Sequence, residues 1–138
     1  MIDENGFGFI EIEHTADWAL KITAADLPEL FTLAARGMYW LMHLSLVDAP
    51  RITRSLDLDG VDNEALLVTF LSELLYLNES EGLAFDDFEL SFQAAHLRAV
   101  LHGAPAAGQK KEIKAVTYHN LAIRPTENGL EATIVFDV

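Results

Sequence analysis

The residues best suited to chemistry are acidic groups at two places far apart in the chain. Asp17 closes the polar motif Glu-His-Thr-Ala-Asp of residues 13–17, and Asp137 precedes the last residue, Val138. If the two strand ends that carry them lie side by side, the two side chains and the terminal carboxylate of Val138 bring three oxygen anions together. Three carboxylates that converge need a counter-ion or raised pKa values. A hard divalent cation with oxygen ligands, calcium or magnesium, would satisfy them.

The motif of residues 13–17 separates two apolar runs, residues 7–13 and 17–23, that alternate in the manner of strands. It is therefore a polar break between strands, where loops usually carry function. We expect the strand that ends at Val138 to lie beside a strand that begins or ends at this motif. Taken alone, Asp17 is typical of a turn or capping aspartate, and Asp137 of a solvated strand edge. His14 could orient Asp17 by a hydrogen bond or be a buried histidine with its own partners.

Apolar residues at helical spacing predict two helices. The first covers about residues 27–44, with Asp26 as its cap and Glu29 completing a capping box. The second follows Asp62 and ends around residues 78–82. Each has an apolar stripe, so both are expected to cover a sheet.

The second half of the chain alternates in the manner of strands. Strands are predicted over residues 51–59, 87–92, 96–102, 121–123 and 130–137. Residues 93–95 and Asn128-Gly129 predict hairpins, and residues 103–108, rich in Gly, Ala and Pro, predict a mobile loop. The order of elements predicts an α+β fold in a single domain, residues 1–138. Its two layers would be two amphipathic helices on one face of a mostly antiparallel mixed sheet.

Composition narrows the classes of function. The net charge of −13 comes from 22 acidic against 9 basic residues. Nucleic acid is bound through clusters of Lys and Arg, so we expect no direct nucleic-acid binding and favour a cation or a basic protein as partner. The chain has no cysteine, no run approaching the ~20 apolar residues of a membrane span, and no signal-peptide pattern at its start. The cytoplasm is the expected location.

Other features leave alternatives open. Lys110, Lys111 and Lys114 form a basic cluster that could contact phosphate or an acidic partner, or could be a solvated loop. The five histidines lack zinc-site spacing. No nucleophile elbow, phosphate-binding glycine loop or catalytic dyad is visible, so catalysis by this chain alone has little support.

Three motifs in order resemble those of the archease family. They are residues 13–17 followed by an Ala-rich amphipathic helix, residues 113–121 with the sequence Ile-Lys-Ala-Val-Thr-Tyr-His-Asn-Leu, and the ending Phe-Asp-Val of residues 136–138. The resemblance covers nearly the whole chain. Archeases are small protein cofactors of the RtcB-type tRNA-splicing ligase, and they are not enzymes by themselves.

The resemblance implies that the chain activates such a ligase, promoting its guanylylation and repeated turnover. It also implies a divalent cation held by Asp17, Asp137 and Val138. We expect calcium, with magnesium or manganese as alternatives. His14, His119 and Lys114 are expected near the cation or facing the ligase.

Two other classes of function stay open from the residues alone. The chain could be a stand-alone metal-dependent hydrolase that uses the carboxylates of Asp17 and Asp137 with a bound water. It could also be a general chaperone or assembly module that uses apolar helix surface. Assays of the protein with and without ligase separate these alternatives.

Overall fold

The structure, a computed structural model, describes residues 1–12, 18–109 and 111–138. Its two helices are α1 (Leu27–Met42) and α2 (Asn63–Glu81). The strands of this described part are β1 (Gly8–Ile12), β2 (Trp18–Ala24), β3 (Ser45–Leu46), β4 (Ile52–Asp59), β5 (Leu83–Gln93), β6 (His96–Ala107), β7 (Ala115–Val116), β8 (Arg124–Pro125) and β9 (Leu130–Asp137).

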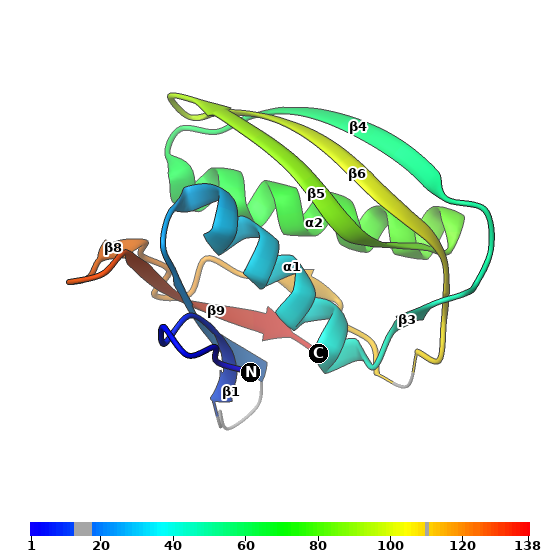
Figure 1. Cartoon of the computed structure of the whole chain (residues 1–138), viewed down its shortest axis with the longest axis horizontal. Helices are drawn as coiled ribbons and strands as arrows, with labels where there is room; N and C mark the ends of the chain where they lie inside the picture. The colour runs from blue at the N-terminus through cyan, green and yellow to red at the C-terminus, as the bar shows by residue number, and fades with distance from the viewer. Residues whose placement is uncertain (13–17, 110) are drawn as a thin grey trace.

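The two helices lie between two sheets (Figure 1). One sheet has the order β1-β2-β9-β7, with β8 also paired to β9, and the other has the order β3-β6-β4, with β5 also paired to β6. All of these pairs are antiparallel. The α+β class is therefore confirmed, but the strands form two sheets where the sequence predicted one. The reason lies in the helices, because each contacts strands of both sheets and is buried from both sides.

The helices begin at the predicted caps. The side chain of Asp26 accepts a hydrogen bond from the Glu29 N–H at 3.0 Å, and that of Asp62 accepts one from Ala65 at 2.8 Å. The carboxylate of Glu29 reaches back to the Ala25 N–H at 2.8 Å, one residue before the cap. The first helix ends at Met42, and the second continues to Glu81, through most of the segment predicted to end it.

Aromatic side chains join the helices to the sheet of β4, β5 and β6. The ring of Phe31 in α1 lies 5.5 Å from that of Phe70 in α2 and 4.8 Å from that of Phe92 in β5, measured between centroids. Phe70 in turn lies 6.1 Å from Phe88 of β5. These tilted and edge-on contacts are the arrangements that aromatic pairs prefer. They tie α1, α2 and β5 into one core.

The prediction of a mobile loop over residues 103–108 is wrong for most of that segment. Strand β6 continues to Ala107, and Gly103 pairs with Ile52 on one side and Phe85 on the other. A Cβ atom at Gly103 would lie 2.0 Å from the Ala84 carbonyl oxygen. Glycine is required at position 103 because the backbones of β5 and β6 approach closely there. A segment rich in glycine has the same composition whether its glycines allow close approach or flexibility.

The short strand predicted over residues 121–123 is also wrong, since the paired residues are the next two, Arg124–Pro125. Both predicted hairpins are confirmed. Gln93 pairs with His96 across the first turn, and the Thr126 N–H donates to the Gly129 carbonyl at 2.8 Å in the second. Neither described helix is long and apolar enough to cross a membrane.

Candidate functional site

The end of β9 is placed by its two neighbours. Trp18, the first residue of β2, pairs with Phe136, and Ala115 of β7 pairs with Asp137. The predicted strand order is therefore confirmed, because the strand that follows the first motif lies directly beside the C-terminal strand. Asp17 and His14, which the sequence predicted as ligand and neighbour, lie outside the described residues.

Asp137 is exposed at this end of the sheet. Its backbone carbonyl accepts a hydrogen bond from the Lys114 N–H at 2.8 Å, which brings the predicted residue Lys114 alongside it. Within the described part of the chain, no ion pair joins the Asp137 carboxylate to a basic side chain. Val138 is half-buried and packs against the core. The carboxylate of Asp137 is thus an exposed oxygen donor at the end of β9.

His119 is connected to the same strand through Thr117. The Thr117 N–H and hydroxyl both donate to the Val135 carbonyl, at 3.0 and 2.9 Å, and the His119 N–H donates to the Thr117 hydroxyl at 3.3 Å. The His119 ring lies 3.3 Å from the Asn120 amide nitrogen. The second motif thus forms a turn fixed to β9, close in sequence to the pairing that carries Asp137.

One lysine of the predicted basic cluster is held against the sheet. The ammonium of Lys111 lies 4.8 Å from the centre of the Trp18 ring, within the range of a cation–π contact. Lys110 lies outside the described residues. Lys111 thus lies at the start of β2, against the residue that pairs with Phe136, so this end of the sheet carries positive as well as negative side chains.

The described residues offer an incomplete set of metal ligands. They contain no group of three Asp, Glu, His or Cys side chains able to hold a metal ion, and Asp17 lies outside them. The donors available at the end of β9 are oxygens, which suit calcium or magnesium rather than zinc or copper. The chemistry fits a hard cation, and the set is complete only if Asp17 contributes.

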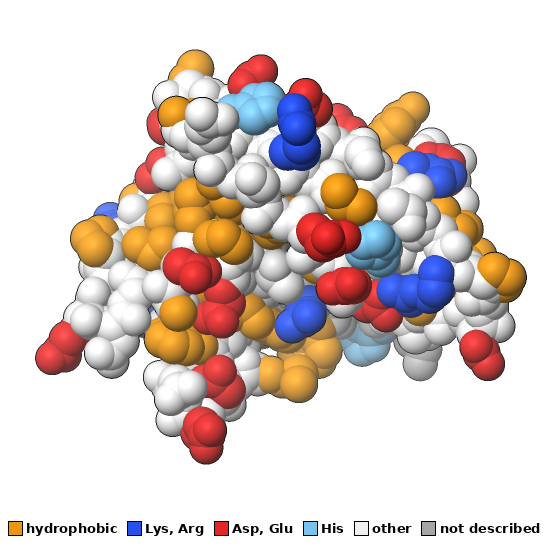
Figure 2. Space-filling model, turned by 45° about the horizontal axis from the view of Figure 1, so that its top comes forward, with side chains coloured by type: hydrophobic (Ala, Val, Ile, Leu, Met, Phe, Trp, Pro, Cys, Tyr) orange, Lys and Arg blue, Asp and Glu red, His pale blue; other side chains and the backbone are white. Residues whose placement is uncertain are grey.

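The outer surface of the second sheet is rich in ionic contacts. Figure 2 shows acidic, basic and histidine side chains interspersed over the side of the molecule that carries β4, β5 and β6. On the opposite, helix-facing side of β4, the carboxylate of Glu81 at the end of α2 lies 2.7 Å from Arg54, and this hydrogen bond lowers the pKa of that carboxyl. Such exposed pairs contribute little to stability.

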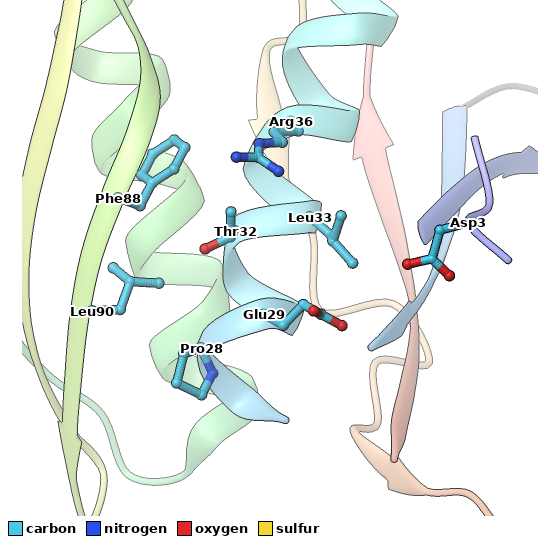
Figure 3. A pocket seen from close by; sticks show the side chains of 8 residues that line it. All are labelled: Asp3, Pro28, Glu29, Thr32, Leu33, Arg36, Phe88 and Leu90. Atoms are coloured by element: carbon cyan, nitrogen blue, oxygen red, sulfur yellow. The ribbon is translucent and has the colours of Figure 1, made fainter. Parts of the chain in front are cut away.

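A cavity with a volume of about 460 Å³ lies along α1. Figure 3 shows Phe88 and Leu90 of β5 pointing toward the α1 side chains, with Asp3 on the opposite side of the helix. The lining residues are Asp3, Pro28, Glu29, Thr32, Leu33, Arg36, Phe88 and Leu90. No sequence pattern predicts this cavity, because both of its walls have the pattern of ordinary amphipathic elements.

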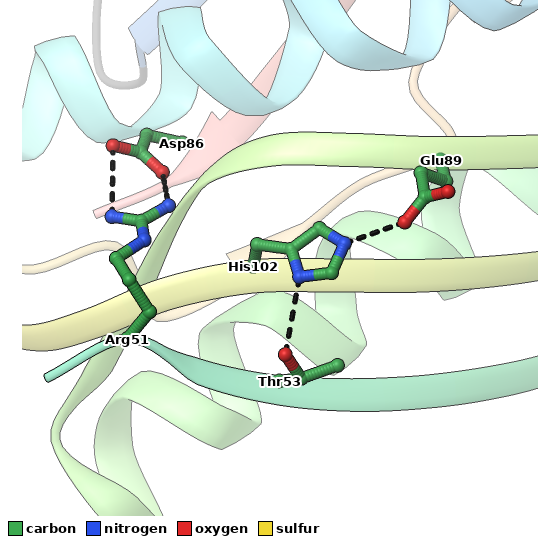
Figure 4. Close-up of polar contacts among 5 residues, drawn as sticks. All are labelled: Arg51, Thr53, Asp86, Glu89 and His102. Atoms are coloured by element: carbon green, nitrogen blue, oxygen red, sulfur yellow. Dashed lines mark hydrogen bonds and ion pairs between the residues drawn. The ribbon is translucent and has the colours of Figure 1, made fainter.

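The register of β4, β5 and β6 also brings polar side chains from the three strands into contact. His102 of β6 lies 3.1 Å from the Thr53 hydroxyl of β4 and 2.5 Å from a Glu89 oxygen of β5, as Figure 4 shows. Beside it, Arg51 forms a two-pronged ion pair with Asp86, and this hydrogen bonding lowers the pKa of the Asp86 carboxyl. These side chains pair with one another, and none of them lines the cavity between α1 and β5.

Comparison with known proteins identifies the family. The model of the Archease protein family matches residues 9–138. The chain belongs to the archease family. Proteins named archease from Pyrococcus furiosus and Methanosarcina barkeri are each 33% identical to it, over 85% and 92% of this chain and 88% and 93% of their own lengths.

Solved structures support the fold of this archease family member. The solution structure of Methanobacterium thermoautotrophicum protein 1598 superposes with a TM-score of 0.71 at 22% identity, covering 95% of this chain and 99% of the other. The crystal structure of a Thermotoga maritima protein described as an archease and possible chaperone gives 0.68 at 25% identity, covering 92% and 94%. The predicted family is thus confirmed, and the α+β fold agrees with these neighbours.

Proposed function

We propose that this archease-family protein activates an RtcB-type RNA ligase in tRNA splicing, as a protein cofactor that promotes ligase guanylylation and multiple turnover. Family membership supports this proposal. In it the chemistry belongs to the ligase, and this chain contributes an acidic, cation-binding end of its sheet in the cytoplasm.

The cation is proposed to bind Asp17, Asp137 and the α-carboxylate of Val138, with calcium favoured over magnesium or manganese. The observation that supports it is the pairing of Trp18 with Phe136, because Trp18 is bonded to Asp17 and Phe136 to Asp137. His14, His119 and Lys114 are proposed to orient the ligands or to face the ligase. When bound, the cation would supply positive charge that neutralises the converging carboxylates.

Lysines offer a competing explanation for the acidic end. Lys111 and Lys114 both lie at this end of the sheet, and their ammonium groups could balance the carboxylates without a metal. A calcium titration by calorimetry separates the two explanations. Saturable binding that is lost in Asp17→Asn supports the metal site, and absence of binding supports the lysines.

The experiment that tests the function is a guanylylation assay of purified ligase with substoichiometric amounts of this protein. We expect the wild-type chain to raise the rate and to permit several turnovers. Asp17→Asn keeps the side-chain shape but removes one charge, so it should abolish stimulation while leaving the far-UV circular dichroism unchanged. Adding a few residues after Val138 should act in the same way, because the α-carboxylate moves away.

Two results would contradict the proposal at different levels. If both variants stimulate the ligase at the wild-type rate, the metal mechanism is wrong even though activation is right. If the wild-type chain fails to stimulate, activation itself is wrong. In that case hydrolysis by the protein alone would favour a metal-dependent hydrolase, and suppressed aggregation of unrelated proteins would favour a chaperone.

A further inference from the structure

One edge of β5 has backbone groups that bond to no described residue. The N–H of Ala106 in β6 donates to the carbonyl of Gly82, the residue before β5. The N–H of Gly60, the residue after β4, donates to the carbonyl of Ala95, the residue before β6. Bonded pairs alternate along an antiparallel ladder, so even-numbered residues of β6 bond toward β5 and odd-numbered residues bond toward β4. The β5 residues opposite odd-numbered β6 residues therefore direct their N–H and C=O groups away from the sheet. They are Phe88, Leu90 and Phe92.

A groove runs beside this edge and shares its residues. Phe88 and Leu90, whose backbones face outward, also line the cavity of about 460 Å³ against Thr32 and Arg36 of α1 (Figure 3). A second cavity, of about 360 Å³, adjoins it through Asp3, Leu33 and Arg36. An extended chain laid along β5 would thus find both unpaired backbone groups and space for alternate side chains, which are the two components of recognition by strand addition.

The charges around the groove select the occupant. Asp3 and Glu29 line the cavity, and Asp87 and Glu89 are exposed on β5 itself, against Arg36 as the basic residue of the lining. Two copies paired through β5 would bring Asp87 and Glu89 of each chain together, and like charges opposite one another destabilise a strand pair. A basic segment would instead meet opposite charge, in a chain whose net charge is −13.

We propose that the free edge of β5 and the groove between β5 and α1 bind an extended, Lys- or Arg-bearing segment of a partner protein by strand addition. Backbone hydrogen bonds to Phe88, Leu90 and Phe92 hold the segment. Its apolar side chains enter the groove, and its basic side chains face the acidic residues. This site is independent of the proposed ligase activation, and it is tested without the ligase.

The test uses the full chain and a fluorescein-labelled nine-residue peptide of alternating Val and Lys. Fluorescence anisotropy should show saturable binding, and the amides of Phe88, Leu90 and Phe92 should exchange with deuterium more slowly in the complex. The matched Val-Glu peptide should bind at least about tenfold more weakly, because its charge is reversed. A Val-Lys peptide N-methylated at alternate residues should also lose binding, since it cannot form the ladder.

Matched variants locate the site on the protein. Thr32→Phe fills the groove and should weaken binding about tenfold or more, whereas Ser72→Phe, at an exposed position of α2, should not. Equal binding of the basic and acidic peptides overturns the proposal, as does binding that survives N-methylation. Concentration-dependent dimerisation that protects the same three amides without peptide also overturns it, because the occupant would then be a second copy.

Discussion

At the scale of single residues, His96 shows how register creates an interaction that no local motif encodes. Its Nδ1 lies 2.6 Å from an Asp59 oxygen, and its Nε2 lies 2.5 Å from an Asp57 oxygen. The imidazole can donate to both carboxylates only when both nitrogens carry protons. The hydrogen bond to Asp59, with the charge of Asp57 adding to it, therefore raises the pKa of His96 above its ordinary value of 6.5.

The consequence is a stability that depends on pH. Because the pKa of His96 is raised in the folded protein, its contribution is complete below the unfolded value near 6.5 and is lost as the pH rises through the folded pKa. We expect His96→Gln to lower the free energy of unfolding at about pH 5.5 and to change it little at about pH 8.5. Urea unfolding at the two pH values measures this difference.

An NMR titration of the ring protons gives the control for His96. In the wild-type protein the pKa should lie above 6.5, and Asp59→Asn should lower it toward that value, since the hydrogen bond that raises it most is weakened. A wild-type pKa at or below 6.5 would contradict the interaction.

At the scale of elements, the sequence predicted those features that depend on residues close together in the chain, such as the helix starts. Both helices start at the predicted caps, Asp26 and Asp62, because an N-cap depends on residues only a few positions apart. The division of strands into two sheets depends on which elements cover each helix, and the α1–β5 groove depends on how two distant elements meet. The sequence of a single segment therefore predicts neither the two sheets nor the groove. Pairing of β2 with β9 was predictable only because a shared site for Asp17 and Asp137 required it.

Residues 103–108 supply the element-scale prediction. In a mobile loop, Gly103→Ala would be harmless. In β6 it places a methyl group 2.0 Å from the Ala84 carbonyl oxygen, so the backbones of two strands must separate. We expect a loss of several kcal/mol of unfolding free energy, beyond the ~1–3 kcal/mol typical of overpacking by a side chain. Urea denaturation measures it, with Ala107→Ser at the exposed end of the strand as a control that should change little. Equal unfolding free energies of the two variants would contradict the strand pairing at Gly103 and support the interpretation of this segment as a loop.

At the scale of the whole molecule, the net negative charge favours binding of cations and basic segments and opposes binding of polyanions. The chain carries 22 acidic and 9 basic residues, and several of the basic groups are already engaged. Arg51 pairs with Asp86, Arg54 with Glu81, and Lys21 lies 3.8 Å from Glu131. The acidic excess is compatible with a cation at the end of β9 and with a basic segment along β5. It opposes any polyanion, so the proposed role in RNA processing would be exercised through another protein.

This reasoning predicts that the protein alone does not bind tRNA at physiological salt. Each phosphate contact contributes about 0.9 to the slope of log K against log salt, and proteins that bind nucleic acid well make roughly 6–10 such contacts. The basic cluster offers at most Lys110, Lys111 and Lys114, and Lys111 is held over Trp18. We therefore expect no change in the anisotropy of labelled tRNA up to high micromolar protein, with a basic RNA-binding protein of similar size as the positive control.

Salt-dependent binding at about micromolar affinity would show that the few lysines act as a phosphate site despite the net charge. The triple variant Lys110→Gln, Lys111→Gln, Lys114→Gln would then abolish it.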